Sequence, residues 1–384
     1  MHSIQIHEII SRTTFVLCRL GIWYRGDKPT VKDLRKKVFF SIYYSFFVIS
    51  VSVGVIKSEN PDQRIFLADI AIGAVVVVVK FWMLVWKQNE ILTLLNRVCV
   101  FSIRYDDDYN RFNYRLTGFM KFVFVFAIIT MVAGSLVSVG LSVIGSDKTL
   151  FLEIGFPLDY KNSDIAFCMA TVFLFTEVFL SLIALFFSIM IWYLLFNCSL
   201  RYEVLGSELK DMGRTSEKRD AKVTERQMHN NFFEDLKTSI DAHLHLRELT
   251  KEVESFLADL FLLQFATSGL CICGSVYCLA FNVGGSLLTS ILYLFVFFYH
   301  VAELIMITYF GNEIMLSSNR LSYSLFESNW YNQPHSTKKC VIIFGEYLKQ
   351  PQAMMIGKLY PLTLETFTRI LNSAYSMFNI LKSF

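Results

Sequence analysis

Ionisable side chains interrupt several of the long apolar runs in this sequence. Asp69, Lys80, Glu177, His300 and Glu303 all lie within such runs. A charged group is costly inside a bilayer and needs a partner, a water-filled path or a route to the interface. Proton-coupled transporters use carboxylates and histidines at such positions, so an ion-coupled transporter is one hypothesis for this chain.

The individual positions of these groups favour structural or ligand-binding roles. Lys80 lies near one end of its apolar run, where its long side chain is expected to extend to the membrane surface. Asp69 lies near the other end of that run, as a hydrogen-bond acceptor for a ligand or a neighbouring helix. Glu177 is the most enclosed carboxylate of its run, and His300 and Glu303 are one helical turn apart. No inverted repeat is apparent, which weakens the transporter hypothesis.

Motifs of common enzyme classes are absent from the sequence. It contains no P-loop, G-x-G-x-x-G, H-E-x-x-H or G-x-S-x-G. His243 and His245 are two residues apart, so on a helix they face different directions and cannot easily share a metal ion. The eight cysteines form no C-x-x-C pair and are expected to be packing thiols. We therefore expect no enzymatic activity, no metal and no cofactor.

The composition is typical of a polytopic membrane protein. Of the 384 residues, 54% are hydrophobic, 18% are charged and 37 are Phe, while the net charge of +3 is too small to indicate nucleic-acid binding. A final segment, Leu362 to Phe384, is long enough to cross a bilayer but carries many polar residues. Six apolar runs predict further spans: Val38 to Ile56, Ile65 to Trp86, Phe119 to Ile144, Ile165 to Phe196, Phe256 to Phe281 and Leu287 to Phe310.

The distribution of Lys and Arg predicts the orientation of these seven spans. The segments that precede spans one, three, five and seven hold 28 Lys and Arg, against 4 in the alternate segments. Basic segments stay in the cytoplasm, so we expect a cytoplasmic N-terminus and an extracellular C-terminus. A G-protein-coupled receptor has the opposite orientation, and this chain also lacks N-P-x-x-Y in its last span. That class remains an alternative.

Three helices are expected to extend beyond the membrane. The fourth span continues as "NCSLRYEVLGSELKDM", and the sixth continues as "GNEIMLSSNRLSYSLFESNWY". An apolar stripe leads into the fifth span. These stripes predict either an intramolecular cytoplasmic bundle or a subunit interface. The residues of the fifth-span stripe are Phe233, Leu236, Ile240, Leu244, Leu249, Val253, Phe256 and Leu260.

The C-terminal part of the chain resembles the insect odorant receptor family. The resemblance is carried, in order, by "NEIMLSSNRLSYSLFESNWY", "KK", "QP" and "PLTLETFTRILNSAYSMFNIL", between Asn312 and Leu381. Ile240 and His243, followed by Phe256 and Gln264, are similar to the family's connection between spans four and five. The N-terminal half resembles the family in layout more than in motif.

The resemblance implies an all-α polytopic membrane protein that serves as the odorant-binding, tuning subunit of a non-selective cation channel. Such a subunit would form a heterotetramer with odorant co-receptor subunits and would respond to a small volatile odorant. It would lie in the plasma membrane lipid bilayer, in the dendrites of olfactory sensory neurons.

The resemblance also implies a division of the chain into four parts. Residues 1–37 form a cytoplasmic N-terminal segment, and residues 38–310 hold spans one to six with the ligand pocket. Residues 311–361 form a cytoplasmic anchor segment with a helix near Thr337 to Lys349. Residues 362–384 form the pore-lining helix. Polar side chains are costly against lipid but not beside a water-filled path, which explains why a membrane-crossing segment could carry them.

An apolar, aromatic pocket with few polar anchors is implied in the outer halves of spans two, three, four and six. Such a pocket suits a ligand held by apolar burial. The alternative for each residue is ordinary helix packing. The candidates are Asp69, Ile72, Gly73, Val76, Leu136, Val139, Ala170, Phe173, Leu174, Tyr293, Leu294 and Phe297.

The final helix supplies the candidates for the pore. Phe378 and Leu381 would form a hydrophobic constriction, and packing against neighbouring helices is the alternative role for both. Lys382 lies near the outer end, where it can extend into bulk water. The predicted pore-lining residues are Tyr375, Phe378, Asn379, Leu381 and Lys382.

Overall fold

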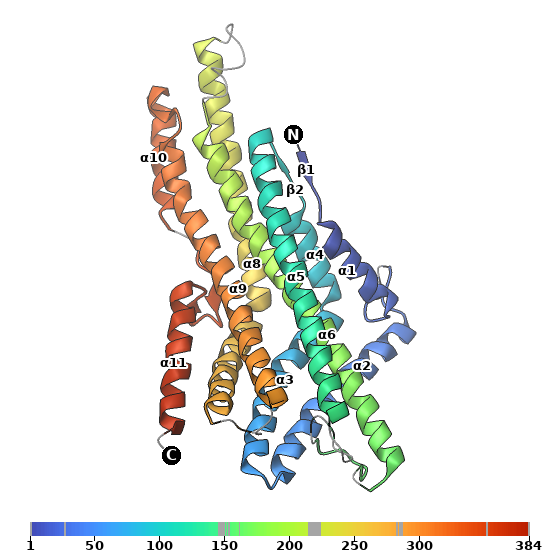
Figure 1. Ribbon diagram of the computed structural model, residues 1–384. Helices are drawn as coiled ribbons and strands as arrows, with labels where there is room; N and C mark the ends of the chain where they lie inside the picture. Colours follow the sequence, from blue (N-terminus) through green and yellow to red (C-terminus); the bar gives the residue numbers. More distant parts are fainter. Residues whose placement is uncertain are drawn as a thin grey trace.

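The computed structural model is almost entirely helical (Figure 1). It describes residues 2–26, 28–144, 150, 152, 154–160, 162–213, 224–281, 283, 287–350 and 352–382, with the side chains of 62, 136–144 and 288 outside that description. The helices are α1 (Glu8–Arg19), α2 (Val31–Lys57), α3 (Pro61–Trp86), α4 (Gln88–Cys99), α5 (Asp106–Ile144), α6 (Asp164–Lys210), α8 (Glu225–Ala280), α9 (Leu287–Phe326), η1 (Trp330–Asn332), α10 (His335–Leu348) and α11 (Leu364–Lys382).

Local sequence signals explain where the long helices begin. Thr30 and Asp33 form a capping box at the start of α2, in which the Asp33 backbone N–H donates to Thr30 Oγ1 at 3.3 Å. Ser163 caps α6 by accepting from the Ala166 backbone N–H at 3.4 Å. Proline stands at the first position of α3, where its missing N–H costs nothing.

Six of these helices are confirmed as candidate membrane spans. Among the described residues, α2, α3, α5, α6, α8 and α9 are long and apolar enough to cross a membrane. Each matches one of the six predicted runs, and only the run ending at Phe281 extends one residue beyond its helix. The seventh predicted span, α11, is a helix of 19 residues that does not meet this criterion because polar residues lower its hydropathy. Its passage through the membrane stays a prediction.

The long helices form an elongated bundle with α6 at its centre (Figure 1). α6 packs along α9 and also contacts α3, α5 and α8. Its 47 residues contain no proline, and every described side chain from Phe187 to Leu200 is buried. The N-terminus lies toward the end of the bundle that holds α10, and the C-terminus lies toward the opposite end (Figure 1). This placement agrees with an odd number of crossings.

Helical extensions form one end of the bundle, as the sequence predicted for spans four, five and six. Leu249 and Val253 of α8 and Leu321 and Leu325 of α9 are fully buried there. α10 packs against α9 and α8 at the same end, with Val341 fully buried. Of the two alternatives, packing within the chain is therefore present, and a subunit interface at this end stays a prediction.

The apolar stripe of α8 differs in register from the predicted one near its N-terminus. Phe233 and Leu244 are 44% and 47% exposed. Phe232 and Leu246 are buried in their place, at 1% and 3% exposure. Adjacent apolar residues allow either of two helix faces to pack, so spacing alone did not decide the register.

Two short antiparallel strand pairs lie near the two ends of the chain. β1 (His2–Ile4) pairs with β2 (Phe101–Ile103), and β3 (Met355–Ile356) pairs with β4 (Tyr360–Pro361). The second hairpin brings Leu362 against α9 at Gly311, where an added Cβ would lie 2.6 Å from the Leu362 carbonyl oxygen. Only glycine allows this approach, which sets where α11 begins.

Candidate functional site

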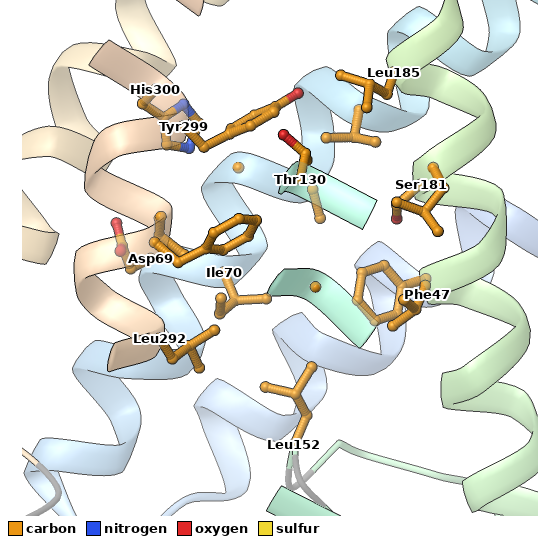
Figure 2. A pocket seen from close by; sticks show the side chains of 18 of the residues that line it. Phe47, Asp69, Ile70, Thr130, Leu152, Ser181, Leu185, Leu292, Tyr299 and His300 are labelled. Carbon is orange, nitrogen blue, oxygen red and sulfur yellow. The ribbon is translucent and has the colours of Figure 1, made fainter. Parts of the chain in front are cut away.

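A cavity of about 260 Å³ lies between α2, α3, α5, α6 and α9 (Figure 2). Leu152, from the connection between α5 and α6, lies at one end of it, and Tyr299 and His300 of α9 lie at the other. Phe47, Ile70 and other apolar side chains form most of the walls.

The size and walls of the cavity suit a small apolar molecule. At the packing density of protein interiors, 260 Å³ holds roughly ten non-hydrogen atoms. Burying about 200 Å² of apolar ligand surface would contribute about 5 kcal/mol to binding. A charged ligand would have to be desolvated against walls that are mostly apolar.

Two hydroxyl groups in the wall are already bonded to each other. Tyr44 Oη and Ser181 Oγ are 2.8 Å apart. Ser181 Oγ also donates to the Glu177 carbonyl oxygen at 2.9 Å, which uses the serine hydrogen. Tyr44 must therefore donate to Ser181, so neither of these two hydroxyl groups keeps a hydrogen for a ligand.

Beyond the His300 end of the cavity lies a buried ion pair. Lys80 Nζ of α3 bonds to Glu303 of α9 and donates to Ser188 Oγ of α6 at 3.0 Å. Tyr299 Oη, which belongs to the cavity wall, lies 3.5 Å from Glu303 Oε1. Lys80 is only 2% exposed, so it does not extend to the membrane surface as the sequence suggested. A carboxylate facing it across the bundle offers a closer partner than the interface does.

The other two buried carboxylates differ in their surroundings. Asp69 is 5% exposed and accepts from Ser275 Oγ of α8 at 3.2 Å, so its carboxylate is directed toward α8. Glu177 is 1% exposed, and neither of its carboxylate oxygens has a hydrogen-bond partner among the described residues. Only Asp69 of these two lines the cavity.

The predicted ligand-binding residues separate into several groups. Asp69 and Gly73 line the cavity. Ala170, Phe173 and Leu174 are not in the lining; they belong to an apolar cluster with Leu67 and Val51 that adjoins the cavity through Leu152.

The remaining candidates lie elsewhere. Tyr293 is buried with Cys278 and Val283, Leu294 is 45% exposed, and Phe297 packs against the main core. Ile72 is half-buried and Val76 is buried on α3, outside the cavity lining. The side chains of Leu136 and Val139 lie outside the described residues. Ligand contact by the set stays a prediction.

Several lining residues were not predicted from the sequence. On α6, Val178, Ser181 and Leu185 continue the face of Leu174 at steps of four, three and four, one to three turns further into the bundle. On α9, Leu292, Val296 and Tyr299 present a face different from the predicted one. The α6 face was thus detectable by extending the helical period. The contribution of α2 through Tyr44 and Phe47 had no sequence signal.

A larger hollow of about 820 Å³ lies between α8 and the α3–α4 corner. Its rim is charged: Lys87 pairs with Glu90 at 2.9 Å, and Glu252 pairs with Arg97 at 2.5 Å. This hollow is more polar than the cavity beside His300 and suits a small apolar molecule less well.

The helix α11 packs against α8 and α9 along one face and leaves the other uncovered. Leu371, Ala374 and Phe378 lie on the packed face, with Phe378 half-buried against the core. The predicted residues Tyr375, Asn379, Leu381 and Lys382 are exposed in the single chain. The uncovered face is rich in small polar side chains, including Asn372, Ser373 and Ser376.

Comparison with known proteins agrees with this architecture. A sequence profile described as "7tm Odorant receptor" matches residues 68–375. Odorant receptor 94a of Drosophila melanogaster is 26% identical over 196 residues, covering 49% of this chain and 46% of that protein. Odorant receptor Or2 of Anopheles gambiae is 23% identical over 195 residues, 48% of this chain and 49% of that protein. The chain thus spans about half the length of these two relatives. Odorant receptor 23a of Drosophila melanogaster is 23% identical over 336 residues, covering 85% of this chain and 84% of that protein.

The fold has also been seen in a solved structure. The insect olfactory receptor OR5 from Machilis hrabei, in complex with eugenol, aligns with a TM-score of 0.80 over 98% of both chains at 14% identity. The fold and the cavity define a polytopic helical membrane protein with an apolar cavity between its helices. The chain belongs to the insect odorant receptor family, a family of odorant receptors and not of enzymes.

Proposed function

We propose that this chain is the odorant-binding, tuning subunit of a ligand-gated, non-selective cation channel formed with odorant co-receptor subunits. The observation that carries the proposal is the apolar cavity of about 260 Å³ between α2, α3, α5, α6 and α9. A small volatile molecule binds mainly through its apolar surface, and the walls of this cavity are mostly apolar. The OR5 receptor, which shares the fold, was solved with eugenol, a small molecule.

In this proposal α11 lines the pore. Its uncovered face carries Asn372, Ser376 and Asn379, which favour contact with water over contact with lipid. Tyr375 and Lys382 flank that face. Phe378, which packs inward within one chain, and Leu381 would narrow the path where subunits meet.

The assembly is proposed to be a heterotetramer held together beyond the membrane. Ile342 and Ile343 on α10 are 54% and 62% exposed, although α10 is otherwise packed against α9. Such side chains favour burial against another subunit. The multi-pass protein would act in the plasma membrane of olfactory sensory neuron dendrites.

The cavity can be tested by filling it. A Cβ added at Gly134, in the cavity wall, would meet no heavy atom within 4 Å. Gly134→Leu should therefore occupy ligand space with little disturbance of packing. Leucine at Gly118 is the matched control, because Gly118 lies on the same helix, has equally open surroundings and is outside the cavity lining.

The measurement is the odorant dose response of each variant expressed with the co-receptor, at matched surface levels. Gly134→Leu should raise the effective odorant concentration at least tenfold or abolish the response, whereas Gly118→Leu should leave it unchanged. An unaltered response in Gly134→Leu would place the odorant site elsewhere.

A further inference from the structure

His300 is one of the polar side chains that line the cavity. It is 5% exposed and belongs to α9, at the end of the cavity away from Leu152 (Figure 2). Its ring contacts α8 through Ser268 Oγ, which lies 3.3 Å from His300 Nδ1. Its second nitrogen, Nε2, has no hydrogen-bond partner among the residues that the structure describes.

The hydrogen bonds behind the ring determine which nitrogen carries the hydrogen. Gln264 Nε2 donates to Ser268 Oγ at 2.8 Å. The serine hydroxyl then has its own hydrogen left to give, and its other side-chain partner among the described residues is His300 Nδ1. Nδ1 accepts that hydrogen, so the neutral ring carries its N–H at Nε2.

The orientation of the Gln264 amide agrees with this direction. Gln264 is 1% exposed, and its Oε1 is buried without a described partner. Reversing the amide would bury both of its N–H hydrogens without an acceptor, and orphaned donors are rarer than under-satisfied carbonyl oxygens. The chain of donation therefore runs from Gln264 through Ser268 to His300.

Access to Nε2 depends on a glycine. Gly73 of α3 also lines the cavity, and a Cβ added there would lie 3.5 Å from His300 Nε2. The absent side chain leaves the N–H uncovered. The hydroxyls of Tyr44 and Ser181, by contrast, have their hydrogens committed within the wall.

We propose that His300 Nε2–H donates a hydrogen bond to an acceptor oxygen of the odorant, so that the cavity selects small carbonyl compounds over hydrocarbons of the same shape. This inference rests on the proposed odorant-binding function of the same cavity. A ligand without an acceptor leaves a buried N–H unpaired, which lowers affinity by roughly 5-fold to 150-fold. The apolar remainder of the ligand contacts the other walls.

The test compares ketones with alkenes in which a methylene group replaces the carbonyl oxygen, such as heptan-2-one and 2-methylhept-1-ene, together with their shorter and longer homologues. Binding is measured as ligand-dependent thermal stabilisation of the purified chain, and activation is measured as current in cells that also express the co-receptor. The ketones should bind and activate at concentrations roughly 10-fold lower than the alkenes.

Three variants examine the donor. His300→Phe keeps a ring of similar shape without N–H groups and should remove the ketone advantage while leaving alkene binding within about twofold. Gly73→Ala should reduce the advantage by covering Nε2 while the histidine is unchanged. Ser268→Ala should reduce it less, because both ring tautomers become available. Leu292→Val, in the same cavity, is the control that should shift ketones and alkenes equally.

The outcomes separate the two proposals. Equal potency of ketones and alkenes, or a ketone advantage that survives both His300→Phe and Gly73→Ala, would overturn the role of His300 while leaving the odorant site in place. Absence of binding and current for every ketone and alkene would contradict the carbonyl preference. The Gly134→Leu experiment then tests separately whether the cavity is the odorant site.

Discussion

Lys80 of α3 and Glu303 of α9 form an ion pair inside the bundle, one helical turn from His300 in the cavity wall. Their side chains are 3% and 0% exposed, and Ser188 of α6 completes the Lys80 contacts at 3.0 Å. The pair therefore joins three helices immediately beyond the end of the cavity that Tyr299 and His300 form.

Breaking this pair should destabilise the protein strongly. Lys80→Met or Glu303→Gln leaves one buried group without its partner and should cost about 3–5 kcal/mol of folding stability. The double variant Lys80→Met, Glu303→Met should recover much of that loss, because no charge remains buried. Thermal unfolding in detergent and the surface level in cells provide the measurements.

An exposed pair is the matched control for that experiment. Lys87 and Glu90 are 2.9 Å apart with side chains 46% and 55% exposed. Breaking them should cost about 1 kcal/mol or less. Equal losses from the buried and the exposed pair would show that the Lys80–Glu303 contact is unimportant for stability.

Phe47 and Phe173 should respond differently to truncation. Phe47 lines the cavity, so Phe47→Ala removes ligand contact worth about 1–3 kcal/mol and should reorder a panel of odorants, with shifts of roughly 5-fold to 150-fold. Phe173 packs against Tyr43 and Phe46, with ring centroids 5.5 and 5.6 Å away. Phe173→Ala should cost about 3–5 kcal/mol of stability and preserve the odorant ranking. If Phe173→Ala changed the odorant ranking and Phe47→Ala did not, the ligand would bind at the apolar cluster around Phe173 and not in the cavity.

Much of the architecture was predictable, because apolar run length and basic segments are local properties of the sequence. The six apolar runs each became the core of a long helix. α1 and α4 were not predicted: each is a 12-residue amphipathic helix in a segment that reads as polar. The start of α5 at Asp106 was not predicted either, because a polar extension of a helix carries little hydropathy signal.

The cavity was harder to predict for a physical reason. A helix that is apolar on all sides does not indicate which face it presents to its neighbours. On α9 the sequence suggested Tyr293, Leu294 and Phe297, whereas the cavity is lined by Leu292, Phe295 and Val296. The partner of Lys80 was equally hidden, because 223 positions separate it from Glu303.

The uncovered face of α11 should control permeation without affecting odorant choice. Asn379→Lys places a positive charge on that face. It should reduce the cation current at saturating odorant several-fold, because the lysine repels cations in the pore. The order of odorant potencies should not change, since Asn379 is outside the cavity lining. Normal current with an altered odorant order would contradict a pore position for this face.

The predicted orientation can be examined with a C-terminal tag. The excess of 28 Lys and Arg against 4 in alternate segments predicts that the tag is outside the cell. Antibody should stain it in unpermeabilised cells, while an N-terminal tag should require permeabilisation. The reverse pattern would favour a G-protein-coupled architecture.

Currents in excised membrane patches test the central claim most directly. Channels in patches that contain this chain and the co-receptor should open within milliseconds to seconds of odorant application, with no GTP present, because the proposal places the ligand site and the pore in one assembly. Patches with Gly134→Leu should respond weakly, and patches with Gly118→Leu should respond normally. A current that requires GTP, or an odorant response indifferent to Gly134→Leu, would contradict the account of this chain as the odorant-binding subunit of a channel.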